Sequence, residues 1–174
     1  TLYVMDLFGL DGISARALAI DTVLPERSEE FPDFTHVWFE TPQQGSDTVI
    51  VHARLDGPSV VGAYRFAMKR DEKVTIDVDS MIVLRRDVTR LGIAPLTSMF
   101  WFSETAKETM TPAIADKRPE VHDSDGLAIQ SEGGEWLWRP LRNPTRNSVS
   151  NFYSRDIKGF GLLQRDRDFG SYQD

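Results

Sequence analysis

The segment RPEVHDSDG at residues 118–126 contains the densest group of side chains that could move protons. Three carboxylates within a few ångströms cannot all stay ionised without raising the pKa of at least one of them, unless cations lie nearby. An arginine and a histidine of the same segment could offset this repulsion. The residues concerned are Arg118, Glu120, His122, Asp123 and Asp125. These residue types fit acid–base chemistry, and residues 123–125 also fit a turn that is capped by its own side chains.

A metal site is a weaker interpretation of this segment. HDSD at residues 122–125 resembles the start of an oxygen-ligand loop, but it lacks the alternating ligands and the closing Glu of a calcium-binding hand. His36, His52 and His122 lie on three different segments and do not have the spacing of zinc ligands. The chain contains no cysteine, which excludes disulfides, thiolate zinc sites and a thiol nucleophile.

Two tryptophans form a second candidate binding feature. Trp136 and Trp138 are two residues apart, so on a strand both indoles project from the same face. Flat apolar faces suit the CH-rich faces of sugar rings, and Arg139 could hydrogen-bond to the hydroxyl groups. The alternative is that both indoles lie in the core with their N–H groups bonded to backbone carbonyls.

Charge and hydropathy exclude several classes of protein. There are 20 basic and 27 acidic residues, a net charge of -7, and no basic block, so we predict no nucleic-acid partner. No apolar run reaches the roughly eighteen residues that span a bilayer. The chain begins with Thr1, so we expect that any signal peptide is not present in this chain. QRDRD at residues 164–168 places Arg165 and Arg167 either at a solvated edge or in an ion-pair network beside a cleft.

The dominant hydrophobic period is two, which predicts strands. Apolar residues alternate over residues 49–55, 60–68 and 74–78, and KRDEK predicts a turn that makes the last two a hairpin. Gly133 and Gly134 predict a second hairpin, whose tight reversal requires positive φ angles. NSVSNFYS at 147–154 and KGFGLLQR at 158–165 continue the strand pattern.

Helix is scarce in the sequence. Asp87 could cap a short turn closed by Gly92, and Ser103 could cap a helix of about two turns over residues 103–110. Eight or nine strands without a fixed repeat predict an all-β fold, an antiparallel β-sandwich. With 174 residues, 40% of them hydrophobic, the chain forms one domain or a large piece of one.

Six segments resemble, in this order, the family of osmoregulated periplasmic glucan biosynthesis proteins G and D. They are SARALAIDT (14–22), GAYRF (62–66), LGIAPLTSMF (91–100), RPEVHDSDG (118–126), GEWLWRPL (134–141) and GFGLLQRDRDF (159–169). The resemblance implies a longer periplasmic protein with a galactose-mutarotase-like β-sandwich and a smaller immunoglobulin-like C-terminal domain. Residues 1–174 would then be an internal portion of the large N-terminal β-sandwich domain.

The resemblance also implies a role in making or trimming β-1,2-linked glucan. Members of the family resemble inverting endo-β-1,2-glucanases, and no cofactor is expected. The general base of the family falls on Asp123, and the general acid would lie beyond Asp174, outside this chain. Inverting enzymes hold two carboxyl groups about 6.5–9.5 Å apart, although a proton relay can lengthen the reach of the base.

Other roles follow from residue chemistry alone. We expect four residues to support the Asp123 loop: Arg118, Glu120, His122 and Asp125. Asp125 is the alternative base if the assignment shifts by two residues. We expect five residues to bind substrate: Trp136, Trp138, Arg139, Arg165 and Arg167.

Two other functions remain open from the sequence. The first is a non-catalytic glucan-binding module that presents the polymer to a membrane glucan synthase. The second is a sugar mutarotase, which only fold analogy suggests.

Overall fold

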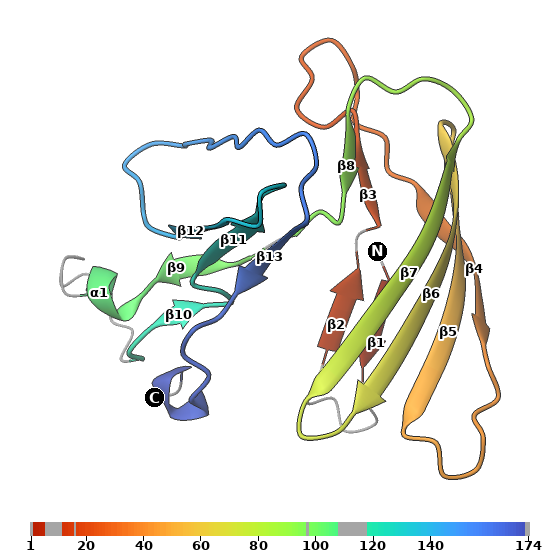
Figure 1. Cartoon of the computed structure of the whole chain (residues 1–174), viewed down its shortest axis with the longest axis horizontal. Helices are drawn as coiled ribbons and strands as arrows, with labels where there is room; N and C mark the ends of the chain where they lie inside the picture. The colour runs from red at the N-terminus through yellow and green to blue at the C-terminus, as the bar shows by residue number, and fades with distance from the viewer. Residues whose placement is uncertain (1, 6–11, 16, 97, 108–117, 173–174) are drawn as a thin grey trace. The chain divides into compact units, whose positions relative to one another are not determined.

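The structure is a computed structural model that describes residues 2–5, 12–15, 17–96, 98–107 and 118–172 (Figure 1). The chain divides into two compact units, Thr1–Pro95 and Leu96–Asp174. The described residues form thirteen strands, and every strand pair is antiparallel. The predicted fold class, all-β and antiparallel, is therefore confirmed.

A four-stranded sheet dominates the first unit, and its strands follow one another in chain order. They are β4 (Asp33–Phe39), β5 (Thr48–Asp56), β6 (Val60–Arg70) and β7 (Val74–Leu84). The hairpin of β6 and β7 is the one that the sequence predicts, with the reversal at Asp71 to Lys73 closed by a backbone hydrogen bond of 3.1 Å. Alternation decides which face of β5 and β6 is buried.

The core of this unit lies between that sheet and a second, two-stranded sheet. The small sheet pairs β3 (Leu18–Ile20) with β8 (Leu91–Ile93). Leu18 and Ile20 pack in one cluster with residues from the large sheet, so two layers share one core. The other buried members are Val51, Ala53, Leu55, Val60, Tyr64 and Phe66. A further pair, β1 (Leu2–Met5) and β2 (Gly12–Ala15), forms its own two-stranded sheet.

The predicted turn from Asp87 to Gly92 is wrong, because Gly92 lies inside β8. Gly92 pairs with Ala19 of β3, and a Cβ at position 92 would lie 2.9 Å from the Cβ of Ala19. The glycine therefore permits close approach of two strands and does not end a turn.

The second unit contains a three-stranded sheet with β11 (Gly126–Gln130) at its centre. Its neighbours are β12 (Trp136–Pro140) and β13 (Gly159–Leu163). The predicted hairpin of β11 and β12 is confirmed, although Gly134 alone of the two glycines has a positive φ, 82°. A separate pair joins β9 (Phe100–Phe102) to β10 (Val121–His122).

Three predictions in the second unit need correction or completion. The predicted strand at 147–154 is wrong, since no residue of that segment pairs in a sheet. Helix α1 (Glu104–Lys107) begins after Ser103 as predicted, and residues 108–110 lie outside the described residues. A 3₁₀ turn, η1 (Phe169–Tyr172), follows β13. The strand count exceeds eight or nine because several strands have only two to four residues.

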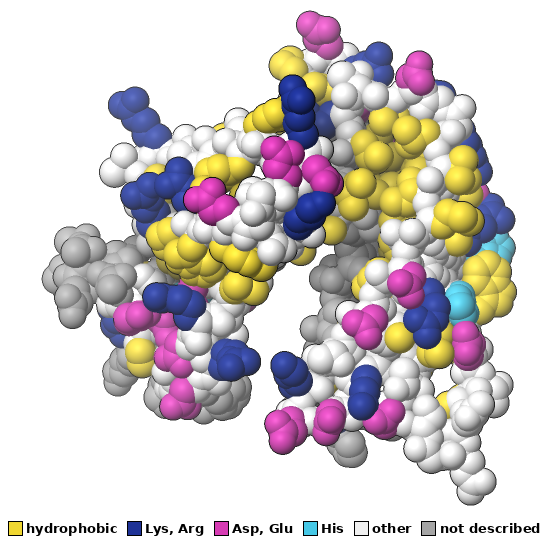
Figure 2. Space-filling view, in the orientation of Figure 1, with side chains coloured by type: hydrophobic (Ala, Val, Ile, Leu, Met, Phe, Trp, Pro, Cys, Tyr) yellow, Lys and Arg dark blue, Asp and Glu magenta, His cyan; other side chains and the backbone are white. Residues whose placement is uncertain are grey.

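Hydrophobic side chains also lie at the surface of both units (Figure 2). Phe39 of β4 and Met81 of β7 are examples in the first unit, and Trp136 is one in the second. No helix among the residues described is long and apolar enough to span a membrane.

Candidate functional site

The HDSDG segment connects β10 to β11 in the second unit, and Asp123 lies in the link between them. The amide of Asp123 donates to the Met99 carbonyl at 2.8 Å, and the Met99 amide donates to Oδ2 of Asp123 at 2.9 Å. This reciprocal pair fixes the carboxylate against the segment that leads into β9. Asp123 is nevertheless exposed, so its side chain is both oriented and accessible to water.

Asp125 has the opposite environment. It is buried, its Oδ2 accepts the Arg165 amide at 2.6 Å, and its own amide donates to the Leu163 carbonyl at 2.9 Å. Its carbonyl accepts the Leu141 amide at 2.7 Å. Asp125 therefore joins the ends of β12 and β13 to the start of β11.

The alternative of a locally capped turn at 123–125 is wrong in detail. The side chains do not cap their own backbone but bond to segments far away in the chain. The hydroxyl of Ser124 lies 2.6 Å from that of Ser98, just as the carboxylate of Asp123 bonds to Met99. The loop is thus held by tertiary hydrogen bonds, which sequence spacing does not reveal.

Glu120 and His122 form a buried pair behind this loop. His122 Nε2 lies 2.7 Å from Oε2 of Glu120 and 3.8 Å from Oδ1 of Asp125. The His122 ring stacks on Phe100, with 5.4 Å between centroids, and meets Tyr172 edge-on at 5.4 Å. The packing of the rings on both sides fixes the position of the imidazole.

The pKa of Glu120 is raised above its ordinary value. Burial is the largest cause, and a hydrogen bond with the Glu104 side chain adds to it, while the hydrogen bond with His122 acts in the opposite direction. Folding therefore makes Glu120 easier to protonate than a glutamate in the unfolded chain.

The one group of potential metal ligands found among the described residues is Glu104, Glu120 and His122. One ligand atom from each lies within 4.8 Å of the others. The sequence did not point to Glu104, which is sixteen positions before Glu120 and shares no ligand motif with it. Two carboxyl groups and an imidazole could hold a divalent cation, and they could equally share a proton between the two carboxyl groups.

The tryptophan pair lies on β12. Trp136 and Trp138 are 63% and 37% exposed, which places both at the surface and not in the core. Trp138 lies across Gly126, since a Cβ at that position would be 2.7 Å from Cζ2 of the indole. Arg139 follows Trp138, so alternation places it on the opposite face of the strand, where its guanidinium lies 5.3 Å from the Phe152 ring centroid.

The remaining arginines of the prediction, Arg118, Arg165 and Arg167, lie outside the strands of this unit. Arg165 is largely exposed, with Nη2 4.0 Å from Oδ1 of Asp125, and Arg167 is exposed two residues later. Arg118 is half-buried, and its carbonyl accepts a hydrogen bond from the Lys107 ammonium. Arg118, Glu120, His122 and Asp125 thus lie in or beside the segment that carries Asp123. The substrate contacts of Arg139, Arg165 and Arg167 stay a prediction.

Comparison with known proteins gives a consistent family. The family model described as "Periplasmic glucan biosynthesis protein, MdoG" matches residues 8–174. Similar proteins include glucans biosynthesis protein D 2 of Ralstonia nicotianae, 55% identical over 164 residues, which cover 94% of this chain and 30% of that relative. Glucans biosynthesis protein G of the same organism is 51% identical over 164 residues, 94% of this chain and 31% of the relative. Glucans biosynthesis protein G of Serratia proteamaculans is 49% identical over 163 residues, 94% and 30% of the respective chains.

The chain spans about 30% of the length of these curated relatives. The match nevertheless covers nearly all of the chain, including the HDSDG segment and both tryptophans. The chain belongs to the periplasmic glucan biosynthesis protein MdoG family.

Proposed function

We propose that the protein containing this chain acts in the periplasm on β-1,2-linked glucan, which it cleaves internally with inversion of configuration. Asp123 is the general base that activates the attacking water. Membership of the glucan biosynthesis family supports the substrate class. The observation that carries the catalytic role is an exposed carboxylate held in place by a backbone amide at 2.9 Å.

A general base must reach a water molecule and keep its orientation as the proton moves. Asp123 meets both needs, because one carboxylate oxygen is anchored by Met99 and the residue is exposed to solvent. Asp125, the alternative base, is buried and bonded at Oδ2 to the Arg165 amide. The contrast favours Asp123 as the base and Asp125 as a residue that positions the loop.

We further propose that residues 1–174 are part of a larger galactose-mutarotase-like β-sandwich domain and that the general acid comes from sequence beyond this chain. Exposed side chains on the large sheet, such as Phe39 and Met81, support this because isolated domains rarely leave so much apolar surface uncovered. Inversion requires a second carboxyl group on the other side of the scissile bond.

The test is the Asp123→Asn variant of the full-length protein. The amide oxygen of Asn can still accept the Met99 N–H, so the loop keeps its anchor while the base is lost. Removal of a general base costs about 10²–10⁴-fold in rate. We expect a loss of this size in the release of reducing ends from linear β-1,2-glucan. NMR of the first products of the unmodified protein should show the α-anomer.

Asp156→Asn is the matched control, since Asp156 is an exposed aspartate of the same unit that pairs with Lys158. It should retain full activity. A correctly folded Asp123→Asn protein that hydrolyses glucan within a few-fold of the unmodified rate would refute the role of Asp123.

A second candidate function is favoured by the exposure of the two indoles on β12. In this alternative the protein binds glucan without cleaving it and presents it to a membrane glucan synthase. Trp136 and Trp138 form the platform, because aromatic faces exposed on a strand can stack on sugar rings.

Hydrolysis by the unmodified protein separates the two functions, and Trp136→Ala and Trp138→Ala test the platform. If the protein only binds glucan, each variant weakens glucan affinity, and no hydrolysis is detected in any form of the protein. If the protein is an enzyme, the unmodified form releases reducing ends. Leu137→Ala, on the opposite face of the same strand, is the control and should leave the affinity unchanged. Unaltered glucan affinity in both tryptophan variants contradicts the platform.

A further inference from the structure

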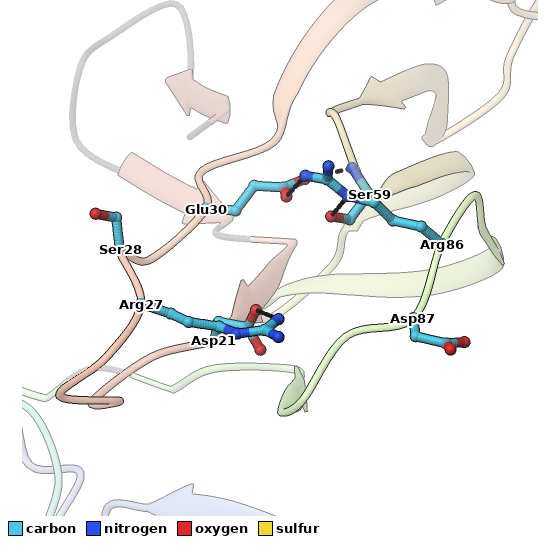
Figure 3. A pocket seen from close by; sticks show the side chains of 7 residues that line it. All are labelled: Asp21, Arg27, Ser28, Glu30, Ser59, Arg86 and Asp87. Carbon is cyan, nitrogen blue, oxygen red and sulfur yellow. Dashed lines mark hydrogen bonds and ion pairs between the residues drawn. The ribbon is translucent and has the colours of Figure 1, made fainter.

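A polar pocket of about 340 Å³ lies wholly within the first unit, among residues that the catalytic proposal does not use (Figure 3). Three segments meet there: the chain after β3, the turn between β5 and β6, and the chain after β7. The lining side chains are all polar or charged: Asp21, Arg27, Ser28, Glu30, Ser59, Arg86 and Asp87. The volume is at the lower end of the range for small-molecule sites, which suits a ligand the size of a sugar unit.

Two lining carboxylates are rigid acceptors. Oδ1 of Asp21 accepts the amides of Thr89 and Arg90, each at 2.9 Å. The Arg90 amide, together with that of Thr89, lowers the pKa of Asp21, so this carboxylate is ionised at neutral pH. The largely buried Glu30 accepts the Ser59 amide at 2.9 Å through Oε1.

The position of Glu30 depends on a glycine. A Cβ at Gly57 would lie 2.8 Å from Oε1 of Glu30 and 3.1 Å from Cβ of Pro32. The turn between β5 and β6 therefore leaves room for the carboxylate only because residue 57 has no side chain.

The two arginines are the donors. Arg86 Nε donates to the Ser59 hydroxyl at 2.7 Å, which orients the guanidinium. Its contact with Glu30 is long, 3.6 Å, as is that of Arg27 with Asp21, 3.5 Å. Figure 3 shows these as two separate groups, Arg86 with Glu30 and Ser59, and Arg27 with Asp21. Both arginine side chains are more than half exposed, so their guanidinium groups can donate to a ligand as well.

The charge of the pocket decides between classes of ligand. The lining holds two arginines and three acidic residues, Asp21, Glu30 and Asp87, so its formal net charge is −1. A phosphate or carboxylate would meet net repulsion. A neutral polyol can accept from the guanidiniums and donate to the carboxylates, so its hydroxyl groups match both sets of partners.

The backbone beside the pocket is strained. Asp21 has φ 54° and Val23 has φ 55°, a left-handed conformation that is a genuine outlier for a β-branched residue. Val23 is 83% exposed, so core packing does not enforce it. Arg90 Nη1 donates to the Thr22 carbonyl at 2.7 Å and holds the segment. Such outliers cluster at ligand sites.

We propose that this pocket binds one glucosyl unit of the glucan, as a second contact point whose residues are all separate from the Asp123 loop. The inference rests on the proposed function for the identity of the sugar. The ligand class, a neutral polyhydroxylated ring, follows from the pocket itself, where arginine donors and carboxylate acceptors both face the ligand space.

The test uses the full-length Asp123→Asn protein, so that glucan is not consumed. A crystal soaked with a linear β-1,2-gluco-oligosaccharide should show a glucosyl ring between Arg27 and Arg86. An empty pocket with the sugar bound elsewhere overturns the proposal. In solution, Arg27→Met and Arg86→Met should together weaken oligosaccharide affinity about tenfold or more, since each removes charge-assisted hydrogen bonds.

Arg65→Met is the matched control, because Arg65 is a half-buried arginine of β6 that pairs with Asp79 at 3.1 Å and does not line the pocket. It should leave the affinity unchanged. Equal affinity in the pocket variants overturns the proposal, as does binding of inorganic phosphate that these variants abolish. The rate of the Asp123→Asn protein separately tests the proposed function, so either idea can fail alone.

Discussion

Glu120 is a buried carboxyl group, and burial disfavours its charged form. It is 2% exposed, contacts His122 at 2.7 Å and shares a hydrogen bond with Glu104. Burial, the largest cause, raises its pKa. The pKa of Glu120 is higher in the folded protein than in the unfolded chain. The contribution of the protonated group to the free energy of unfolding is therefore fully present at low pH. This contribution is lost as pH rises from about 4.3, the ordinary pKa of Glu, through the pKa of the folded protein.

The first prediction concerns Glu120→Gln, which keeps the shape of the group and removes its ionisation. Glutamine can still accept from His122 and donate to Glu104. The variant and the unmodified protein should have equal thermal unfolding midpoints near pH 4. As pH rises, the midpoint of the variant should exceed that of the unmodified protein by a growing margin. Thermal unfolding from pH 4 to pH 8 measures the difference.

Glu132→Gln serves as the control for this series, since Glu132 is exposed in the turn between β11 and β12. Its unfolding midpoint should stay close to that of the unmodified protein in every sample of the series, because substitution of an exposed side chain rarely changes stability. A difference between Glu120→Gln and the unmodified protein that stays constant from pH 4 to pH 8 would contradict the raised pKa.

At the scale of elements, β11 organises the second unit. It pairs with β12 on one side and β13 on the other, and Asp125 at its start bonds to both neighbours. Its first residue, Gly126, lies under Trp138, and a Cβ there would be 2.5 Å from the Arg139 carbonyl oxygen. Backbone of a paired strand cannot move aside cheaply, so the glycine is required for the position of both β12 and its indole.

Gly126→Ala should therefore destabilise the full-length protein by about 1–3 kcal/mol, the usual cost of overpacking a fitted site. Because Trp138 must move, glucan affinity should fall in the same variant if the indoles form a platform. Denaturant titration measures the first effect and calorimetry the second.

Gly161→Ala on β13 is the matched comparison. A Cβ at Gly161 would meet no atom within 4 Å, so we expect a change of less than about 1 kcal/mol. Equal stability of the two alanine variants would show that the contact at Gly126 imposes no constraint.

The sequence predicted the long elements well and the short ones poorly, for a physical reason. Strands β5, β6 and β7 have nine to eleven residues, enough for a period of two to be visible. Strand β8 has only three residues, too few to show a period of two. Gly92 within it therefore fitted the end of a turn as well as it fitted a strand. Residues 147–154 include Val149, Phe152 and Tyr153, types that favour strands, but the segment has no partner strand. A local sequence pattern does not say which segments pair.

At the scale of the whole molecule, the sequence located the candidate loop but not what holds it. Asp123 is predictable because it lies in a dense polar segment. Its anchor, Met99, is 24 positions away, and Glu104 reaches Glu120 from helix α1. These contacts arise when β9 pairs with β10, so they depend on tertiary structure and carry no local signal.

The most direct measurement is the rate at which the full-length Asp123→Asn protein releases reducing ends from saturating linear β-1,2-glucan. Its thermal unfolding midpoint must match that of the unmodified protein. We expect this rate to be about 10²–10⁴-fold lower than that of the unmodified protein. A rate close to that of the unmodified protein would contradict the claim that this anchored, exposed carboxylate activates the water.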